Sequence, residues 1–196
     1  MTTEEQGPES GPDSEAKRPA PITAPKGRRA PDVPTVEAAL TPSGEALAAL
    51  LPDVLAPFEL EIGADIDEVV CRVAPEHVAE VCAALKSDTR TFMKYLRLIT
   101  VVDYEENDQE FEVVYHLYSL EHQHKMVLKA RVPAADPALP TVTTVWRGAD
   151  WYEREMHDLF GVVFSGHPNL VTLILPDGFE GYPGRKSYPL HDYDEW

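Results

Sequence analysis

The chain has 196 residues and a formal net charge of −17 at pH 7, from 34 acidic and 17 basic residues. This balance argues against nucleic acid as a ligand, because phosphates require a basic surface, and against direct binding to an anionic membrane. Its two cysteines, Cys71 and Cys82, are too few for a four-thiolate iron–sulfur cluster or a disulfide framework, so we expect reduced core residues.

The first 34 residues are rich in proline and polar residues, and their only large aliphatic side chains are Ile22 and Val33. Such a segment buries too little apolar surface to offset its ordering entropy, so we expect residues 1–34 to be a disordered tail. Its acidic residues fit neither a secretory signal nor a transit peptide. No apolar run approaches the roughly 20 residues that span a bilayer. We therefore expect a cytoplasmic chain that meets the membrane only through partners.

The next part of the chain predicts one helix, two strands and a second helix. Leucines at helical spacing after Ser43, its expected N-cap, predict a short helix ended by Pro52. Alternating patterns at 58–62 and 69–73 predict two strands that form a hairpin. Pro75 suits the first position of a helix. The apolar positions of that helix follow i, i+3, i+4 and i+7 spacing: Val78, Val81, Cys82 and Leu85.

Three further strands are predicted in the middle of the chain. The apolar run 96–102 is followed by period-two alternation at 111–118 and 125–132, with polar turns at 105–109 and 121–124. Such alternation with short turns is typical of an antiparallel meander with one buried face. Helices that cover this face make an α+β fold, mainly an antiparallel sheet, which we place at residues 35–160.

The clearest helix of the second half begins at Asp150. Glu153, three residues later, fits a capping box, and Gly161 is a typical C-terminal stop. The apolar side chains of this helix share one stripe: Tyr152, Met156, Leu159 and Phe160.

Residues 161–196 have a different character. Four prolines and four glycines interrupt the stretch after Gly161, and only 171–175 has the pattern of a strand. Irregular segments of this length are uncommon unless disordered or functional, and the many aromatic residues argue against disorder. We interpret residues 161–196 as an extended irregular arm that is ordered chiefly by a partner protein.

Two sets of residues resemble metal ligands: His122 and His124 beside Glu121, and Glu153 with His157 and His167. Neither set is completed by a further ligand at a fixed spacing, so contacts with solvent or partners are favoured over a metal ion. A small metal-dependent hydrolase that uses these residues is the alternative from a different functional class.

The stretch E-R-E-M-H-D-L-F-G at residues 153–161 is similar to E-R-E-x-x-D-L-F-G, the signature of the C-type subunit of the NADH:quinone oxidoreductase (respiratory complex I) family. Other segments also fit this family: L-R-L-I-T-V-V-D-Y (96–104), W-R-G-A-D-W (146–151), V-F-S-G-H-P-N-L (163–170), L-I-L-P-D-G-F-E-G-Y-P (173–183) and R-K-S-Y-P-L (185–190). The resemblance covers residues 58–190. The chain departs from the family pattern at Val171 and Thr172, usually arginines, at Gly184, usually leucine, and at Ser187, usually aspartate.

The resemblance implies a cofactor-free structural subunit in the peripheral arm of the complex, on the cytoplasmic face of the cell membrane. NADH, flavin, iron–sulfur clusters and quinone would belong to partner subunits. This chain would pack against the quinone-site and terminal iron–sulfur subunits and support electron transfer to quinone coupled to ion translocation. A related membrane-bound hydrogenase or deazaflavin dehydrogenase is the alternative assembly.

The residues that we expect at a partner interface combine charges of the 150–160 helix with residues of the arm. Among them, Arg154, Glu155 and Asp158 are expected to fix the arm, and Arg185 is expected to anchor it to the partner. The full set is Glu153, Arg154, Glu155, Asp158, His167, Tyr182, Arg185, Lys186 and Tyr188.

Overall fold

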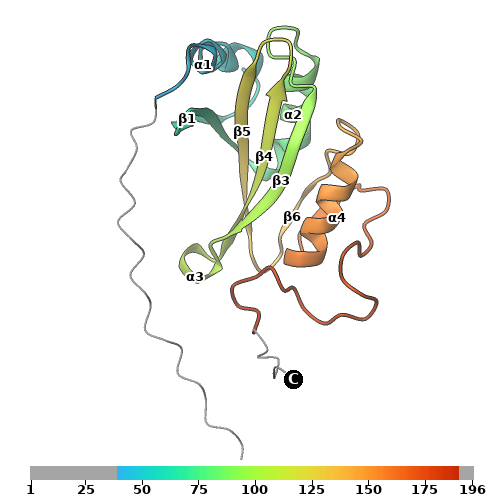
Figure 1. Cartoon of the computed structure of the whole chain (residues 1–196). Helices are drawn as coiled ribbons and strands as arrows, with labels where there is room; N and C mark the ends of the chain where they lie inside the picture. The colour runs from blue at the N-terminus through green and yellow to red at the C-terminus, as the bar shows by residue number, and fades with distance from the viewer. Residues whose placement is uncertain (1–38, 190–196) are drawn as a thin grey trace, which may run out of the picture. The chain divides into compact units, whose positions relative to one another are not determined.

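The computed structural model describes residues 39–189, drawn in colour in Figure 1. The expected tail at 1–34 and the last residues of the expected arm lie outside this range. The described part contains a five-stranded sheet with strand order β1-β2-β5-β4-β3, together with helices and a two-stranded sheet. The α+β prediction is confirmed.

Two predicted strand groups are present. Strands β1 (Leu60–Asp65) and β2 (Glu68–Val73) form the antiparallel hairpin. Strands β3 (Tyr95–Asp103), β4 (Glu110–Ser119) and β5 (His124–Pro133) form the antiparallel meander. The turn between β3 and β4 contains the short helix α3 (Glu105–Asp108).

The hairpin joins the meander through a parallel pair, which the alternation pattern does not predict. Residues 69–72 of β2 lie in register with residues 126–129 of β5, so the sheet is mixed. Parallel neighbours need a long crossover connection. Here it contains the 3-10 helix η1 (Pro75–His77), helix α2 (Val78–Ser87) and strands β3 and β4.

Helix α1 (Pro42–Val54) differs from its prediction at both ends. Thr41, and not Ser43, is the N-cap, and its hydroxyl accepts a hydrogen bond from the Gly44 N–H. The Ser43 hydroxyl instead donates to carbonyls of the β4–β5 turn. Pro52 lies in the last turn of α1 and does not end it, because the buried leucines of this helix hold it against β2 and β5.

The core lies between one face of the sheet and the helices. Helix α1 packs on β2 and β5, while α4 (Ala149–Phe160) packs on β3 (Figure 1). Cys71 and Cys82 are buried, unbridged core residues, as predicted. Burial raises the pKa of both thiols, that of Cys71 to about 11.

The core continues beyond α4. Strands β6 (Ala138–Pro140) and β7 (Val163–Ser165) pair in parallel, and the side chains of Val162 and Phe164 are buried in the main core. Core residues are therefore present beyond residue 160, where the sequence predicts the end of the α+β domain. The strand expected at 171–175 does not form: residues 173–175 are bends, and residues 171 and 172 have no regular structure.

Candidate partner interface

Helix α4 begins at Ala149, after an N-cap at Gly148. The capping-box prediction for Glu153 is wrong, because its fully buried carboxylate points toward the β6–α4 connection. There it accepts hydrogen bonds from the Val142 N–H at 2.7 Å and from the Thr141 hydroxyl. The expected interface role of Glu153 is corrected as well, since its side chain has no exposed surface for a partner.

Burial raises the pKa of Glu153 to about 7, and the Thr141 and Val142 hydrogen bonds only partly offset this effect. The side chain of His167 is also fully buried: its Nε2 lies 3.1 Å from Asp150 Oδ1 and 3.9 Å from Glu153 Oε2. His167, another expected interface residue, therefore holds the turn after β7 against α4.

The raised pKa of Glu153 predicts a pH dependence of stability. Between its ordinary pKa of 4.5 and about 7, the folded chain retains a proton that the unfolded chain has lost, so stability falls as pH rises. Glu153→Gln should remove this effect, and its free energy of unfolding relative to the wild type should rise by about 2–3 kcal/mol between pH 4.5 and 8. Denaturant titrations across this range, with Glu155→Gln as the charge-matched control, test the prediction; a constant difference contradicts it.

Two other charges of α4 bind the backbone of residues 171–175. Arg154 donates to the carbonyl oxygens of Val171 and Thr172, at 3.1 and 2.9 Å. One turn later, Asp158 Oδ2 accepts hydrogen bonds from the N–H groups of Leu173, Ile174 and Leu175, at 2.7, 2.7 and 3.2 Å. We call this pair the Arg154–Asp158 clamp.

The clamp replaces the strand pairing that residues 171–175 lack. Burial alone would raise the pKa of Asp158, but its three backbone donors and the nearby His157 hold it below the ordinary value. The expectation that Arg154 and Asp158 fix the arm is confirmed. Asp158 is only 4% exposed, so its expected contact with a partner is corrected to a contact within the chain. Glu155 is partly exposed on the same helix.

Arg185 fastens the C-terminal segment, which we define as residues 166–189, to the end of α4. Its Nε donates to the Phe160 carbonyl at 2.8 Å, and its guanidinium lies 4.9 Å from the ring centre of Phe111 and 4.7 Å from that of Tyr182. The N–H of Gly184 donates to the Leu159 carbonyl, and a Cβ at this glycine would lie 2.9 Å from that oxygen. Arg185 is thus an anchor within the chain, and its partner role remains a prediction.

The end of the described segment is held by the β3–β4 turn. The buried Asp103 accepts hydrogen bonds from the N–H groups of Lys186 and Glu105, at 2.8 and 2.7 Å. The Ser187 hydroxyl donates to Glu105. Tyr188 stacks on Phe179 with 6.2 Å between ring centres. The side chain of Lys186 is exposed and that of Tyr188 is partly exposed, so both remain available to a partner.

These contacts fix a backbone whose large apolar side chains face outward. Four such side chains lie close together in the sequence of the C-terminal segment and are between 40% and 55% exposed: Val171, Ile174, Phe179 and Tyr182. Contiguous exposed apolar patches are typical of protein–protein contact sites, and these four side chains are the candidates for one. We call these four residues the segment surface.

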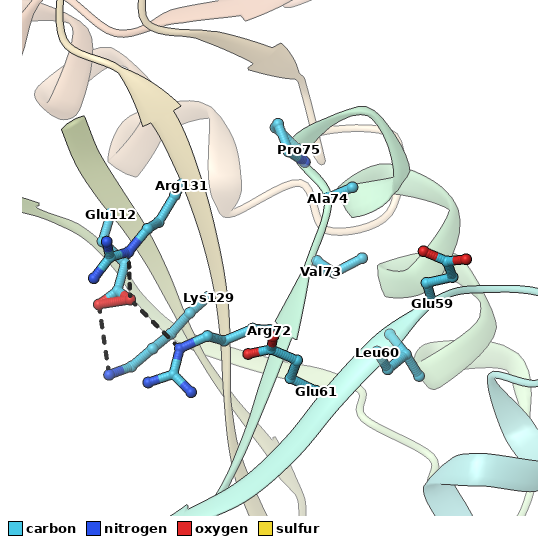
Figure 2. A pocket seen from close by; sticks show the side chains of 10 residues that line it. All are labelled: Glu59, Leu60, Glu61, Arg72, Val73, Ala74, Pro75, Glu112, Lys129 and Arg131. Atoms are coloured by element: carbon cyan, nitrogen blue, oxygen red, sulfur yellow. Dashed lines mark ion pairs between the residues drawn. The ribbon is translucent and has the colours of Figure 1, made fainter. Parts of the chain in front are cut away.

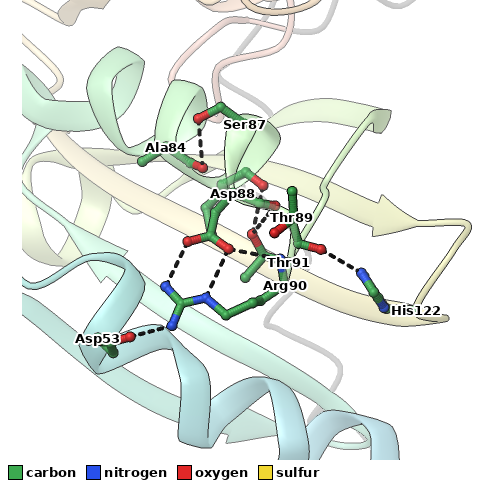
Figure 3. Close-up of polar contacts among 9 residues, drawn as sticks. Asp53, Ala84, Ser87, Asp88, Thr89, Arg90, Thr91 and His122 are labelled. Carbon is green, nitrogen blue, oxygen red and sulfur yellow. Dashed lines mark hydrogen bonds and ion pairs between the residues drawn. The ribbon is translucent and has the colours of Figure 1, made fainter.

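The histidines suggested as metal ligands have other contacts. His122 Nε2 lies 2.8 Å from the Thr89 carbonyl oxygen in the turn that follows α2, where Arg90 also bridges Asp88 and Asp53 (Figure 3). His122 stacks on the buried His124, and Glu121 pairs with Lys94. His157 Nδ1 lies 2.9 Å from the Val162 carbonyl. Across residues 39–189, no group of three potential ligands is placed to hold a metal ion.

A helix that holds an irregular segment with exposed apolar side chains leaves a surface that another protein can cover. Residues 71–194 match the family model described as the 30 kDa subunit of respiratory-chain NADH dehydrogenase. The chain belongs to this family, which confirms the resemblance seen in the sequence.

Curated relatives in this family are named as C-type subunits of NADH-quinone oxidoreductase. The protein from Roseiflexus castenholzii is 39% identical over 144 residues, which cover 74% of this chain and 80% of the relative. The protein from Salinispora tropica is 42% identical over 127 residues, or 64% of this chain. The match spans about half of the Salinispora relative, 52% of its length.

Two solved structures share the fold. A trypsin-resistant fragment of Nqo5 is 32% identical with a TM-score of 0.54, and the match covers 64% of this chain and 99% of the fragment. A chain of the membrane-bound sulfane sulfur reductase, an archaeal respiratory membrane complex, is 28% identical with a TM-score of 0.65, and the match covers 75% of this chain and 86% of that one.

Among the described residues, no helix has the length and apolar character needed to cross a bilayer.

Proposed function

We propose that this chain is a structural subunit of the peripheral arm of a complex I type NADH:quinone oxidoreductase, at the cytoplasmic face of the membrane. In this proposal it packs against the quinone-site and terminal iron–sulfur subunits and has no cofactor of its own. NADH, flavin, iron–sulfur clusters and quinone belong to those partners, and the chain supports electron transfer to quinone by holding them in place.

The observation that carries this proposal is the way in which the chain fixes the segment surface. The Arg154–Asp158 clamp binds five backbone groups of residues 171–175, so Ile174 stands outward, 55% exposed, on a fixed backbone. An apolar surface that is ordered before binding loses less conformational entropy when a partner covers it. Family membership supports a subunit role, and the segment surface supplies a contact surface for it.

The segment surface can be tested by charge substitution. Ile174→Asp combined with Phe179→Asp should lower co-purification of partner subunits with the tagged chain at least tenfold, because both carboxylates would have to be buried at the interface. Leu120→Asp is the matched control, since Leu120 is 64% exposed in the β4–β5 turn, far from this segment in sequence. Co-purification by the double variant equal to that of the control would contradict the proposal.

A second candidate assembly is a related respiratory membrane complex, such as a membrane-bound hydrogenase or deazaflavin dehydrogenase. The likeness to a chain of the membrane-bound sulfane sulfur reductase supports such a complex as the alternative assembly. Mass spectrometry of the subunits that co-purify with the chain distinguishes the two, because only the complex I type assembly brings an NADH-oxidising flavoprotein.

A further inference from the structure

The face of the five-stranded sheet that carries Arg72, Glu112 and Lys129 contains a crevice of about 600 Å³ where β2 and β5 separate. The two strands are parallel neighbours only as far as the pair Arg72 and Lys129. After this pair, β2 ends at Val73 and the chain turns into η1, whereas β5 continues to Pro133.

Three cations converge on one buried carboxylate in this crevice (Figure 2). Glu112, whose side chain is 3% exposed, lies 3.9 Å from Arg72, 3.6 Å from Lys129 and 3.8 Å from Arg131. These distances exceed those of a hydrogen bond. Arg131 has other acidic partners in Asp108 and Glu110. Within residues 39–189, Glu112 is the only carboxylate within 4 Å of the charged groups of Arg72 and Lys129.

The rim of the crevice limits the kind of ligand. Glu59 and Glu61 are exposed residues of its lining, and Glu61 lies opposite Arg72 in the β1–β2 register. A ligand with several negative charges, such as a polyphosphate, would be repelled by these two carboxylates. A single carboxylate on an otherwise neutral segment is repelled less than such a ligand and carries the charge that pairs with Arg72 and Lys129.

A second hollow lies beside the crevice, and its lining is apolar at its base and acidic at the β1–β2 turn, where Asp65, Asp67 and Glu68 line it. This hollow of about 330 Å³ shares Lys129 with the first, and its lining includes the buried cluster of Val70, Val114 and Val127. An extended peptide places alternate side chains on the same side. A segment with an acidic residue next to an apolar one along that side therefore matches the two hollows together.

We propose that an extended segment of a partner subunit binds this crevice, with one of its carboxylates paired to Arg72 and Lys129 and an apolar side chain over the Val70, Val114 and Val127 cluster. The inference rests on the proposed function only in taking the partner to be another subunit of the assembly. The crevice shares no residue with the segment surface, so the two contacts can fail separately.

Zero-length carbodiimide cross-linking tests the proposal, because this reagent joins an amine only to a carboxylate that touches it. In the assembled complex, mass spectrometry should find Lys129 joined to an acidic residue of another subunit, whereas the isolated full-length chain should give only the internal link to Glu112. Arg72→Gln should lower the yield of the intersubunit link about tenfold. Lys125→Gln is the matched control: Lys125 lies on β5, outside the crevice lining, and pairs with Asp67. It should leave the yield unchanged.

Acetylation of Lys129 gives an independent readout, with slower labelling in the complex than in the isolated chain. An unchanged labelling rate together with no intersubunit link would overturn the proposal. Slow labelling without a link, reproduced by adding acetate to the isolated chain, would overturn it in favour of a small carboxylate ligand. If the intersubunit link is absent while partner subunits still bind the segment surface, this inference fails and the proposed function stands. If the link is present while the segment surface binds no partner, the proposed contact at the segment surface fails and this inference stands.

Discussion

Asp158→Ala should release residues 173–175 from helix α4 and abolish stable assembly of the chain with its partners. The substitution leaves three backbone N–H groups without the acceptor that binds them at 2.7–3.2 Å. Hydrogen bonds to a charged group contribute about 1.5–3 kcal/mol each, and water recovers part of this loss, so we expect the free energy of unfolding to fall by about 2–4 kcal/mol. Denaturant titration and co-purification measure the two effects.

Two comparisons make this result specific. Asp158→Asn keeps an oxygen acceptor but not its charge, and should show an intermediate loss. Asp177→Ala removes an exposed aspartate from the same segment and should behave as the wild type. Equal effects of Asp158→Ala and Asp177→Ala would show that the clamp does not hold the segment.

Phe164→Ala should destabilise the chain by about 3–5 kcal/mol, the usual cost of deleting a large core aromatic side chain. Phe164 is 1% exposed and belongs to the main core, although it follows helix α4 and lies in the part that the sequence assigns to the arm. The loss should appear as a lower denaturation midpoint with an unchanged slope.

Val163→Ala is the control for this substitution, because Val163 is the preceding residue of β7 and is 42% exposed. It should cost less than about 1 kcal/mol. Similar small effects of both substitutions would place the end of the domain at residue 160 after all.

The sequence predicts the parts of the fold that depend on local periodicity. The apolar stripe that contains Met156 identifies helix α4, and the alternation around Tyr115 identifies β4. Local periodicity does not predict the order of the strands in the sheet. The parallel pairing of β2 with β5 joins segments more than fifty residues apart, and the alternation in each strand is compatible with other strand orders. The crevice follows from that pairing, so no local pattern brings its cations together.

The incorrect predictions at the candidate interface have one physical cause: side chains of α4 bind backbone outside the helix, and local sequence patterns do not show such contacts. Glu153 matches the local spacing of a capping box, yet its carboxylate binds Thr141 and Val142, which come before the helix. The backbone of residues 171–175 is satisfied by side chains, so it leaves no periodic pattern. One signal is present: Arg154 and Asp158 lie four residues apart, on one face of α4. The clamp binds the backbone of Val171 and Thr172, so this contact does not depend on the side chains at these two positions.

Hydrogen exchange of the amides of Leu173, Ile174 and Leu175 in the isolated full-length chain tests the central claim most directly. The sequence favours an arm ordered chiefly by its partner, which would exchange fast until the complex forms. The clamp instead predicts that these three amides are protected in the isolated chain, and that Asp158→Ala removes this protection while leaving the amides of β4 protected. Exchange of the three amides at the rate of an unstructured peptide in the wild-type chain would contradict the account.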